Sequence, residues 1–306
     1  MSWVPSVQIA PSVLMPLLNF GVSQQHPLFL SLGGRGLDTA FDYGDKAQRE
    51  VGASVASSGI PRSELFITTK IPCCPSAFVR DSKYSDHCHA RRTPAETAAD
   101  IAHDFQTLNL TYVDLMLVHW PCDSVADNVA TWKVLEKLLF DGRARSIGVS
   151  NFNASILEAL VASQEVRVPP AVNQVAFSIA GYGVSKASNP GDSPCAAHRG
   201  PTFPCLSHSD VIYRNQSWGR SDATLAKCRQ LGVTPVAYSV SATQNMLGSP
   251  RAPSLDWIPR LMLAASLSLR VTCLRSRSPR SLLAGGLSEG PHEFSPTRAS
   301  KASRRR

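Results

Sequence analysis

Seven short apolar segments, rich in β-branched residues, recur between residues 17 and 239 and predict β-strands. They are LLNFGV (17–22), GLDTA (36–40), LFITTK (65–70), VDLMLVH (113–119), RSIGVS (145–150), AVNQV (171–175) and VTPVAYS (233–239). Helical patterns separate them, over residues 46–57, 93–108, 128–140, 153–162 and 222–231. Strands that alternate with helices favour parallel pairing with helical crossovers.

The ends of two predicted helices support this pattern. Thr93-Pro94-Ala95-Glu96 combines an N-cap threonine, a proline at the first helical position and a capping-box glutamate. Asp141-Gly142 is a typical stop for the helix over 128–140. No G-x-G-x-x-G follows the first strand, which argues against an open doubly wound sheet. We therefore predict an α/β fold, a (β/α)8 TIM-type barrel with seven recognisable strands and an incomplete C-terminal end.

Four polar residues lie at, or just past, the ends of predicted strands: Asp38, Tyr43, Lys70 and His119. Active sites of parallel barrels lie at these carboxyl ends. A phenol keeps its proton to a pH of about 10, an adjacent ammonium lowers that pKa, and a carboxylate holds the ammonium charged. Such a phenol can protonate a carbonyl oxygen while hydride arrives at the carbon. Without their flanking sequences, the four residues would be ordinary strand-end polar groups.

The flanking sequences resemble the aldo-keto reductase family. The matching stretches, in family order, are MPLLNFGV (15–22), GGRGLDTAFDYGDKAQREVG (33–52), ELFITTKI (64–71), LTYVDLMLVHWP (110–121), GRARSIGVSNF (142–152), AVNQV (171–175) and VTPVAYS (233–239). The resemblance implies that Tyr43 is the general acid and that Lys70 lowers its pKa. It further implies that Asp38 orients Lys70 and that His119 hydrogen-bonds the substrate carbonyl.

The resemblance also implies a nicotinamide cofactor. It places Ser150, Asn151 and Gln174 on the nicotinamide carboxamide, which offers both a donor and an acceptor. It places Tyr238 against the nicotinamide ring, with a core position as the alternative. Trp120 is expected to line the substrate pocket, with packing at the barrel rim as the alternative.

NADPH as the cofactor is implied by the resemblance alone. A 2′-phosphate needs basic residues in a fixed arrangement, and family members supply them beyond the position of residue 240. Arg270, Arg275 and Arg277 offer charge there without a recognisable spacing. We thus expect an NADP-dependent oxidoreductase that reduces an aldehyde or ketone, a small-molecule carbonyl substrate. The alternative is a catalytically impaired barrel with a binding or regulatory role.

Two regions depart from the alternating pattern. Residues 183–220 are rich in Pro, Gly, Ser and Cys and predict a long insertion, with a substrate-gating lid as an open alternative. Residues 246–306 are rich in Arg and Ser, and only LSLRVTCL (267–274) alternates as a strand would. We therefore predict a barrel domain over 15–245 and a divergent basic tail over 246–306.

The net charge of +8 belongs to that tail. Residues 1–250 hold 20 Lys and Arg against 20 Asp and Glu, and residues 251–306 hold 11 against 3. A nucleic-acid-binding face needs basic residues clustered on folded elements, so we expect no nucleic-acid partner. No apolar run reaches the roughly 18 residues of a membrane span, so we expect no membrane partner.

Eight cysteines lie at positions 73, 74, 88, 122, 195, 205, 228 and 273, without a regular framework. Residues 1–18 have no basic segment and contain three prolines, so we expect no secretory leader. These features predict a cytoplasmic location with free thiols. Cys88 lies between two histidines but lacks the second ligand pair of a zinc site, so we expect no metal.

Overall fold

The computed structural model describes residues 5–21, 25–75, 88, 92–176 and 222–238. The chain divides into two compact units, Met1–Ser254 and Leu255–Arg306, and every described residue belongs to the first. The predicted insertion at 183–220 and the predicted tail at 246–306 lie outside the described residues. The proposed boundary at residue 245 therefore remains a prediction.

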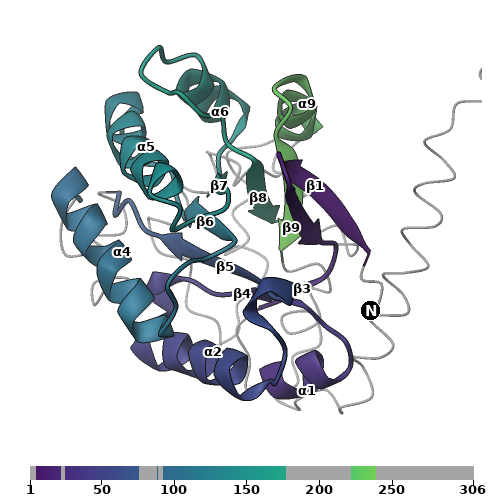
Figure 1. Ribbon diagram of the computed structural model, residues 1–306. Coiled ribbons are helices and arrows are strands. Elements are labelled where there is room, and N and C mark those ends of the chain that lie inside the picture. The colour runs from purple at the N-terminus through teal and green to yellow at the C-terminus, as the bar shows by residue number, and fades with distance from the viewer. Residues whose placement is uncertain (1–4, 22–24, 76–87, 89–91, 177–221, 239–306) are drawn as a thin grey trace, which may run out of the picture. The chain divides into compact units, whose positions relative to one another are not determined.

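Seven parallel strands form one sheet in chain order, each on its predicted segment (Figure 1). They are β3 (Asn19–Phe20), β4 (Gly36–Asp38), β5 (Phe66–Ile71), β6 (Leu115–Val118), β7 (Ile147–Ser150), β8 (Val172–Ala176) and β9 (Thr234–Tyr238). Consecutive parallel neighbours are what repeated βα units produce. The seven predicted strands and their parallel pairing are confirmed.

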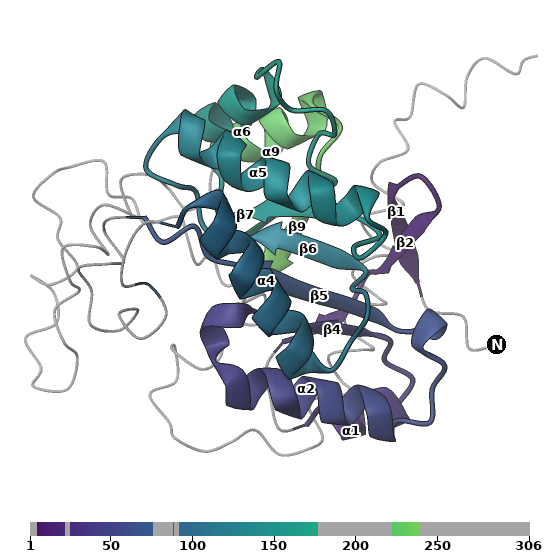
Figure 2. The same ribbon diagram turned by 60° about the vertical axis from the view of Figure 1, so that its left-hand side comes forward.

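Helices connect the strands and cover one face of the sheet (Figure 2). They are α2 (Asp45–Ser57), α4 (Pro94–Leu108), α5 (Val125–Phe140), α6 (Ala154–Val161) and α9 (Asp222–Gln230). The predicted capping box of Thr93 and Glu96 opens α4, and Gly142 adopts a positive φ of 71° after α5. None of the helices in the described ranges is long and apolar enough to cross a membrane.

The strand alternation separates two apolar clusters. Ile71, Met116 and Val149 face the helices and pack with Phe105 of α4 and Trp132 of α5. The opposite face, called the inner face below, has a smaller cluster of side chains from the starts of the strands, Phe66, Leu115, Leu117 and Val172. Because side chains alternate along a strand, the polar residues that share this inner face are fixed by register.

An antiparallel hairpin and a short helix complete the described residues. The hairpin strands β1 (Ser6–Ala10) and β2 (Val13–Pro16) cover part of the inner face with Ile9, Val13 and Met15. The short helix is α1 (His26–Ser31). This part of the chain contains prolines at positions 5, 11 and 16. They lie before, between and at the end of the two strands, where a missing N–H is tolerated.

The prediction of free thiols is wrong at four positions. Cys73 is bonded to Cys122, and Cys74 is bonded to Cys88. Cys228 is a buried free cysteine. Cys88 is 2% exposed, and its disulfide removes the thiolate that a metal would need.

Candidate active site

The carboxyl ends of β4, β5 and β6 bring the predicted residues together. In the sequence FITTKI of β5, alternation places Phe66, Thr68 and Lys70 on the inner face. Asp38 pairs in register with Thr68 and so ends β4 on the same face. Tyr43 follows on a single 3-10 turn, η1 (Phe41–Tyr43).

Lys70 is a buried ammonium held by two acceptors. It is 1% exposed, and its Nζ donates to the carboxylate of Asp38 and, at 2.8 Å, to the backbone carbonyl of Thr39. Burial lowers the pKa of Lys70, but the charges of Asp38 and Tyr43 outweigh it, so the pKa lies above its ordinary value. Lys70 is therefore positively charged at neutral pH, as the sequence analysis requires.

Tyr43 lies beside this ammonium and at the open side of the site. The Nζ of Lys70 is 5.2 Å from the centroid of the Tyr43 ring, and Tyr43 is 46% exposed. Lys70 lowers the pKa of Tyr43 more than any other single influence, as expected. Burial and the carboxylates of Asp38 and Asp42 together exceed that effect, so the net pKa is raised. The expected lowering by Lys70 is thus present, but burial first, and then the two carboxylates, outweigh it.

That second carboxylate is Asp42, which sequence analysis missed. Its Oδ1 lies 2.7 Å from Nδ1 of His119, and the two side chains are only 6% and 7% exposed. The ring of His119 also meets that of Tyr43 edge to face, with centroids 5.7 Å apart. A carboxylate directly before the tyrosine in AFDYG was the available signal.

The four predicted cofactor-binding residues share one hydrogen-bond network at the ends of β7, β8 and β9. The Oγ of Ser150 donates to the backbone carbonyl of Gln174 at 2.9 Å. Nδ2 of Asn151 donates to the carbonyl of His119 at 3.0 Å, and its Oδ1 accepts from the hydroxyl of Tyr238 at 2.9 Å. Asn151 adopts a left-handed φ of 63°, a backbone conformation that asparagine tolerates best among non-glycine residues.

Gln174 joins this network to the tyrosine site. Its Nε2 donates at 2.7 Å to Oδ2 of Asp38, the carboxylate that also holds Lys70. Trp120 is 6% exposed and its ring stacks on that of His119, with centroids 5.2 Å apart. This position agrees with both expectations for Trp120, the pocket lining and the rim packing.

A protein-family model described as the Aldo/keto reductase family matches residues 27–247, well over half of the chain. The chain belongs to the aldo-keto reductase family. The fold of that family is a (β/α)8 barrel, and the seven-stranded parallel sheet with its outer helices is the corresponding arrangement here.

Individual members of the family align over different lengths. An aldo-keto reductase of Mycolicibacterium smegmatis is 33% identical over 80% of this chain and 84% of its own length. The morphine 6-dehydrogenase of Pseudomonas putida is 36% identical over 56% of this chain. The chain spans about half the length of that dehydrogenase and of a similar Mycobacterium tuberculosis aldo-keto reductase, 54% and 56%.

A solved structure supports the fold. The Bombyx mori aldo-keto reductase in complex with NADP superposes with a TM-score of 0.56, over 88% of this chain and 77% of that one. The sequence identity is 22%, so this likeness concerns the fold alone.

Behind the candidate site lies a buried polar cluster that the sequence pattern did not predict. Asp104 of α4 is fully buried and accepts from Gln48 of α2 and, at 3.0 Å, from the hydroxyl of Thr69. Gln48 in turn accepts from the hydroxyl of Thr39. Burial raises the pKa of Asp104 to about 7, against the lowering effect of its hydrogen bonds. The cluster ties both helices to the residues next to Asp38 and Lys70.

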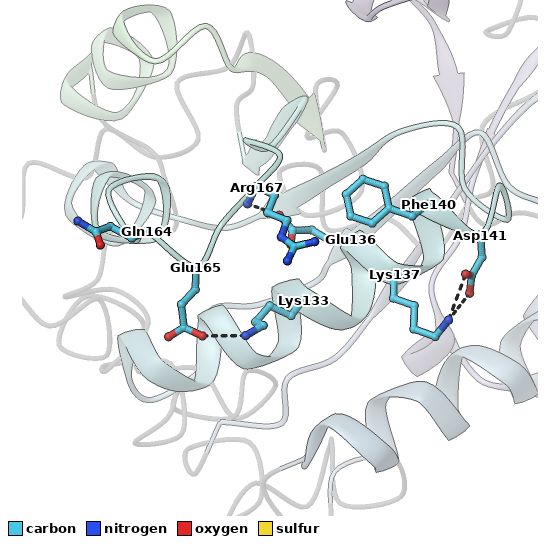
Figure 3. Close-up of a pocket in the computed structure, with 8 residues that line it drawn as sticks. All are labelled: Lys133, Glu136, Lys137, Phe140, Asp141, Gln164, Glu165 and Arg167. Carbon is cyan, nitrogen blue, oxygen red and sulfur yellow. Dashed lines mark hydrogen bonds and ion pairs between the residues drawn. The ribbon is translucent and has the colours of Figure 1, made fainter.

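A hollow, lined mainly by charged side chains, lies away from the candidate site (Figure 3). It has a volume of about 570 Å³ and lies between the end of α5 and the loop before β8, which is the amino-terminal side of the strands. Most of its charged side chains are paired, since Lys133 forms an ion pair with Glu165 and Lys137 forms one with Asp141, each at 2.8 Å. The hollow is lined by Lys133, Glu136, Lys137, Phe140, Asp141, Gln164, Glu165 and Arg167. It contains none of the predicted site residues.

Proposed function

We propose that this chain is an NADPH-dependent oxidoreductase that reduces an aldehyde or ketone to the alcohol, with Tyr43 as the proton donor. The observation that carries the proposal is the buried ammonium of Lys70, held by Asp38 and lying 5.2 Å from the Tyr43 ring. An ammonium in this place stabilises the phenolate that forms when the proton leaves. The raised pKa of Tyr43 means that the phenol still carries that proton at neutral pH.

The residues at the ends of β7, β8 and β9 fit the nicotinamide end of such a cofactor. Ser150, Asn151 and Gln174 offer a hydroxyl and two amides on neighbouring strand ends, and a carboxamide needs donors and acceptors of this kind. We propose that Tyr238, whose hydroxyl donates a hydrogen bond to Asn151, packs against the face of the nicotinamide ring. When bound, the cofactor supplies a hydride to the carbonyl carbon.

The protein groups then have separate tasks in the reduction. Tyr43 gives its proton to the carbonyl oxygen as negative charge develops there. Lys70 stabilises the phenolate that remains, and Asp38 fixes the position of Lys70. We propose that His119 forms a hydrogen bond with the substrate carbonyl and that Trp120 lines the substrate pocket. The residues for the adenosine 2′-phosphate lie outside the described part of the chain, so the preference for NADPH rests on the family.

The test is NADPH oxidation by the full chain with a panel of small aldehydes and ketones, together with a fluorescence titration of NADPH. Tyr43→Phe should lower turnover by about 10²–10⁴-fold, the usual contribution of a general acid, while NADPH binding changes little. Retention of more than about a tenth of wild-type turnover would contradict the assignment of Tyr43.

A chain that binds NADPH but reduces none of the carbonyls would favour the alternative of an impaired binding protein. No observation in the described residues favours that alternative now. A cytoplasmic location also remains a prediction.

A further inference from the structure

The pairing of Asp42 with His119 assigns a tautomer to the histidine. A carboxylate only accepts hydrogen bonds, so the His119 nitrogen that faces it, Nδ1, must carry a proton. Burial raises the pKa of Asp42, but the charge and hydrogen bond of His119, together with the backbone and Lys70, lower it below its ordinary value. Asp42 is therefore ionised at neutral pH, and among the described residues its carboxylate is hydrogen-bonded to the side chain of His119.

The tautomer decides what the other ring nitrogen can do. A neutral imidazole has one N–H, and an imidazole with its proton on Nδ1 has a bare Nε2 that only accepts. A carbonyl oxygen is also only an acceptor, so neutral His119 in this state cannot bind it. The imidazolium carries protons on both nitrogens, so its Nδ1 can donate to Asp42 at 2.7 Å while its Nε2 donates to a carbonyl oxygen.

We propose that Asp42 is a positioning residue that holds the Nδ1 proton of His119, so that Nε2 donates to a substrate carbonyl only when the ring is an imidazolium. The inference rests on the proposed reductase function. After loss of its proton, Nε2 is an acceptor and suits the hydroxyl of the alcohol in the reverse reaction. The pair thus gives carbonyl reduction an advantage at lower pH and alcohol oxidation an advantage at higher pH.

Other titratable groups act on the pair from the elements around it. Lys70 supports the charge on Asp42, and Tyr43 is neutral at the pH values in question. Asp38 is bonded to Lys70, and Asp104 is within electrostatic range of Asp42 from the far side of β5. Among the carboxylates of the described residues, Asp42 is the one in hydrogen-bond contact with the His119 ring.

Asp42→Asn is the variant that tests the role, because it keeps the shape and removes the charge. Asparagine can donate to Nδ1, which permits a neutral ring with its proton on Nε2. The matched control is Asp45→Asn, which alters a second Asp–His pair, with His103 at 2.8 Å, about half exposed and outside the proposed site.

The first measurement is a long-range ¹H–¹⁵N NMR spectrum of the unliganded full chain above the pH at which His119 loses its charge, with His119 assigned by its loss in His119→Gln. We expect protonated Nδ1 and bare Nε2 in the wild type and in Asp45→Asn, and loss of this preference in Asp42→Asn. Protonated Nε2 in the neutral wild type would overturn the proposal. This readout needs no turnover, so a chain with the expected tautomer but no reductase activity would count against the proposed function alone.

The second measurement is kcat/KM for reduction of 4-nitrobenzaldehyde by NADPH at pH 6 and pH 9. We expect the wild type and Asp45→Asn to lose at least about tenfold between the two values, since the imidazolium fraction of a histidine falls about tenfold for each pH unit above its pKa. Asp42→Asn should show a nearly flat profile. A purely structural role for Asp42 would lower activity equally at both pH values, and that result would also overturn the proposal.

Discussion

Replacing Lys70 by methionine is the sharpest test of the proposed proton donor. The substitution keeps an unbranched apolar chain in a site that is 1% exposed, and it removes only the ammonium. Asp38 keeps its hydrogen bond from Gln174, so the carboxylate is not left without a partner. The change therefore isolates the electrostatic effect of the ammonium on Tyr43.

The expected size follows from the 5.2 Å between the Lys70 Nζ and the centroid of the Tyr43 ring. Two unit charges at that distance interact by about 3 kcal/mol at an effective dielectric constant of about 20. Tyr43 is 46% exposed, so water screens part of this energy, and we take half of it, about 1.5 kcal/mol, as the lower bound. Lys70→Met should then lower kcat for carbonyl reduction by about 10- to 100-fold.

The assay is single-turnover reduction of 4-nitrobenzaldehyde at pH 7 with saturating NADPH, so that product release does not hide the chemical step. Lys137→Met is the matched control, because Lys137 is 74% exposed and pairs with Asp141 at the far end of α5. The control should react at the wild-type rate. If Lys70→Met loses less than about threefold while its thermal unfolding is unchanged, the ammonium does not act on the proton transfer and the reasoning fails.

Two further predictions concern stability. The pKa of Asp104 is about 7 in the folded chain against an ordinary 3.8, so the folded state binds the extra proton and stability falls as pH rises from about 4 through 7, by up to about 4 kcal/mol. Urea unfolding from pH 5 to 8 should show Asp104→Asn gaining on the wild type as pH rises, and a constant difference would contradict the buried carboxyl. The Cys73–Cys122 disulfide spans 49 residues, so Cys73→Ser with Cys122→Ser should lower the free energy of unfolding by about 4 kcal/mol. An unchanged urea midpoint after this double substitution would show that the bond does not constrain the unfolded chain.

The parts of the fold that the sequence predicted are those that local patterns determine. The β5 segment alternates between the inner face and the helices, and the capping box at Thr93 marks the start of α4 without any knowledge of the rest of the chain. The β1–β2 hairpin escaped prediction because its short strands are stabilised by contact with the inner face, through Ile9 and Met15. That contact depends on the assembled sheet, which a local pattern does not contain.

The same distinction explains the site. Asp38, Lys70 and His119 were predictable because parallel strands bring their carboxyl ends to one rim, whatever the exact register.

Register explains what was missed. Ile71 and Val118 pair in register at the ends of the adjacent strands β5 and β6. Cys73 lies two residues after Ile71 and Cys122 lies four residues after Val118, so the strand order brings both cysteines to neighbouring loops, where their Cα atoms are 5.3 Å apart. The contact of Asp42 was harder to predict, because it depends on the η1 turn, which directs the Asp42 carboxylate toward Nδ1 of His119. The predicted site residues Asp38, Lys70 and His119 thus follow from where strands end, whereas the contact of Asp42 with His119 follows from how one turn is folded.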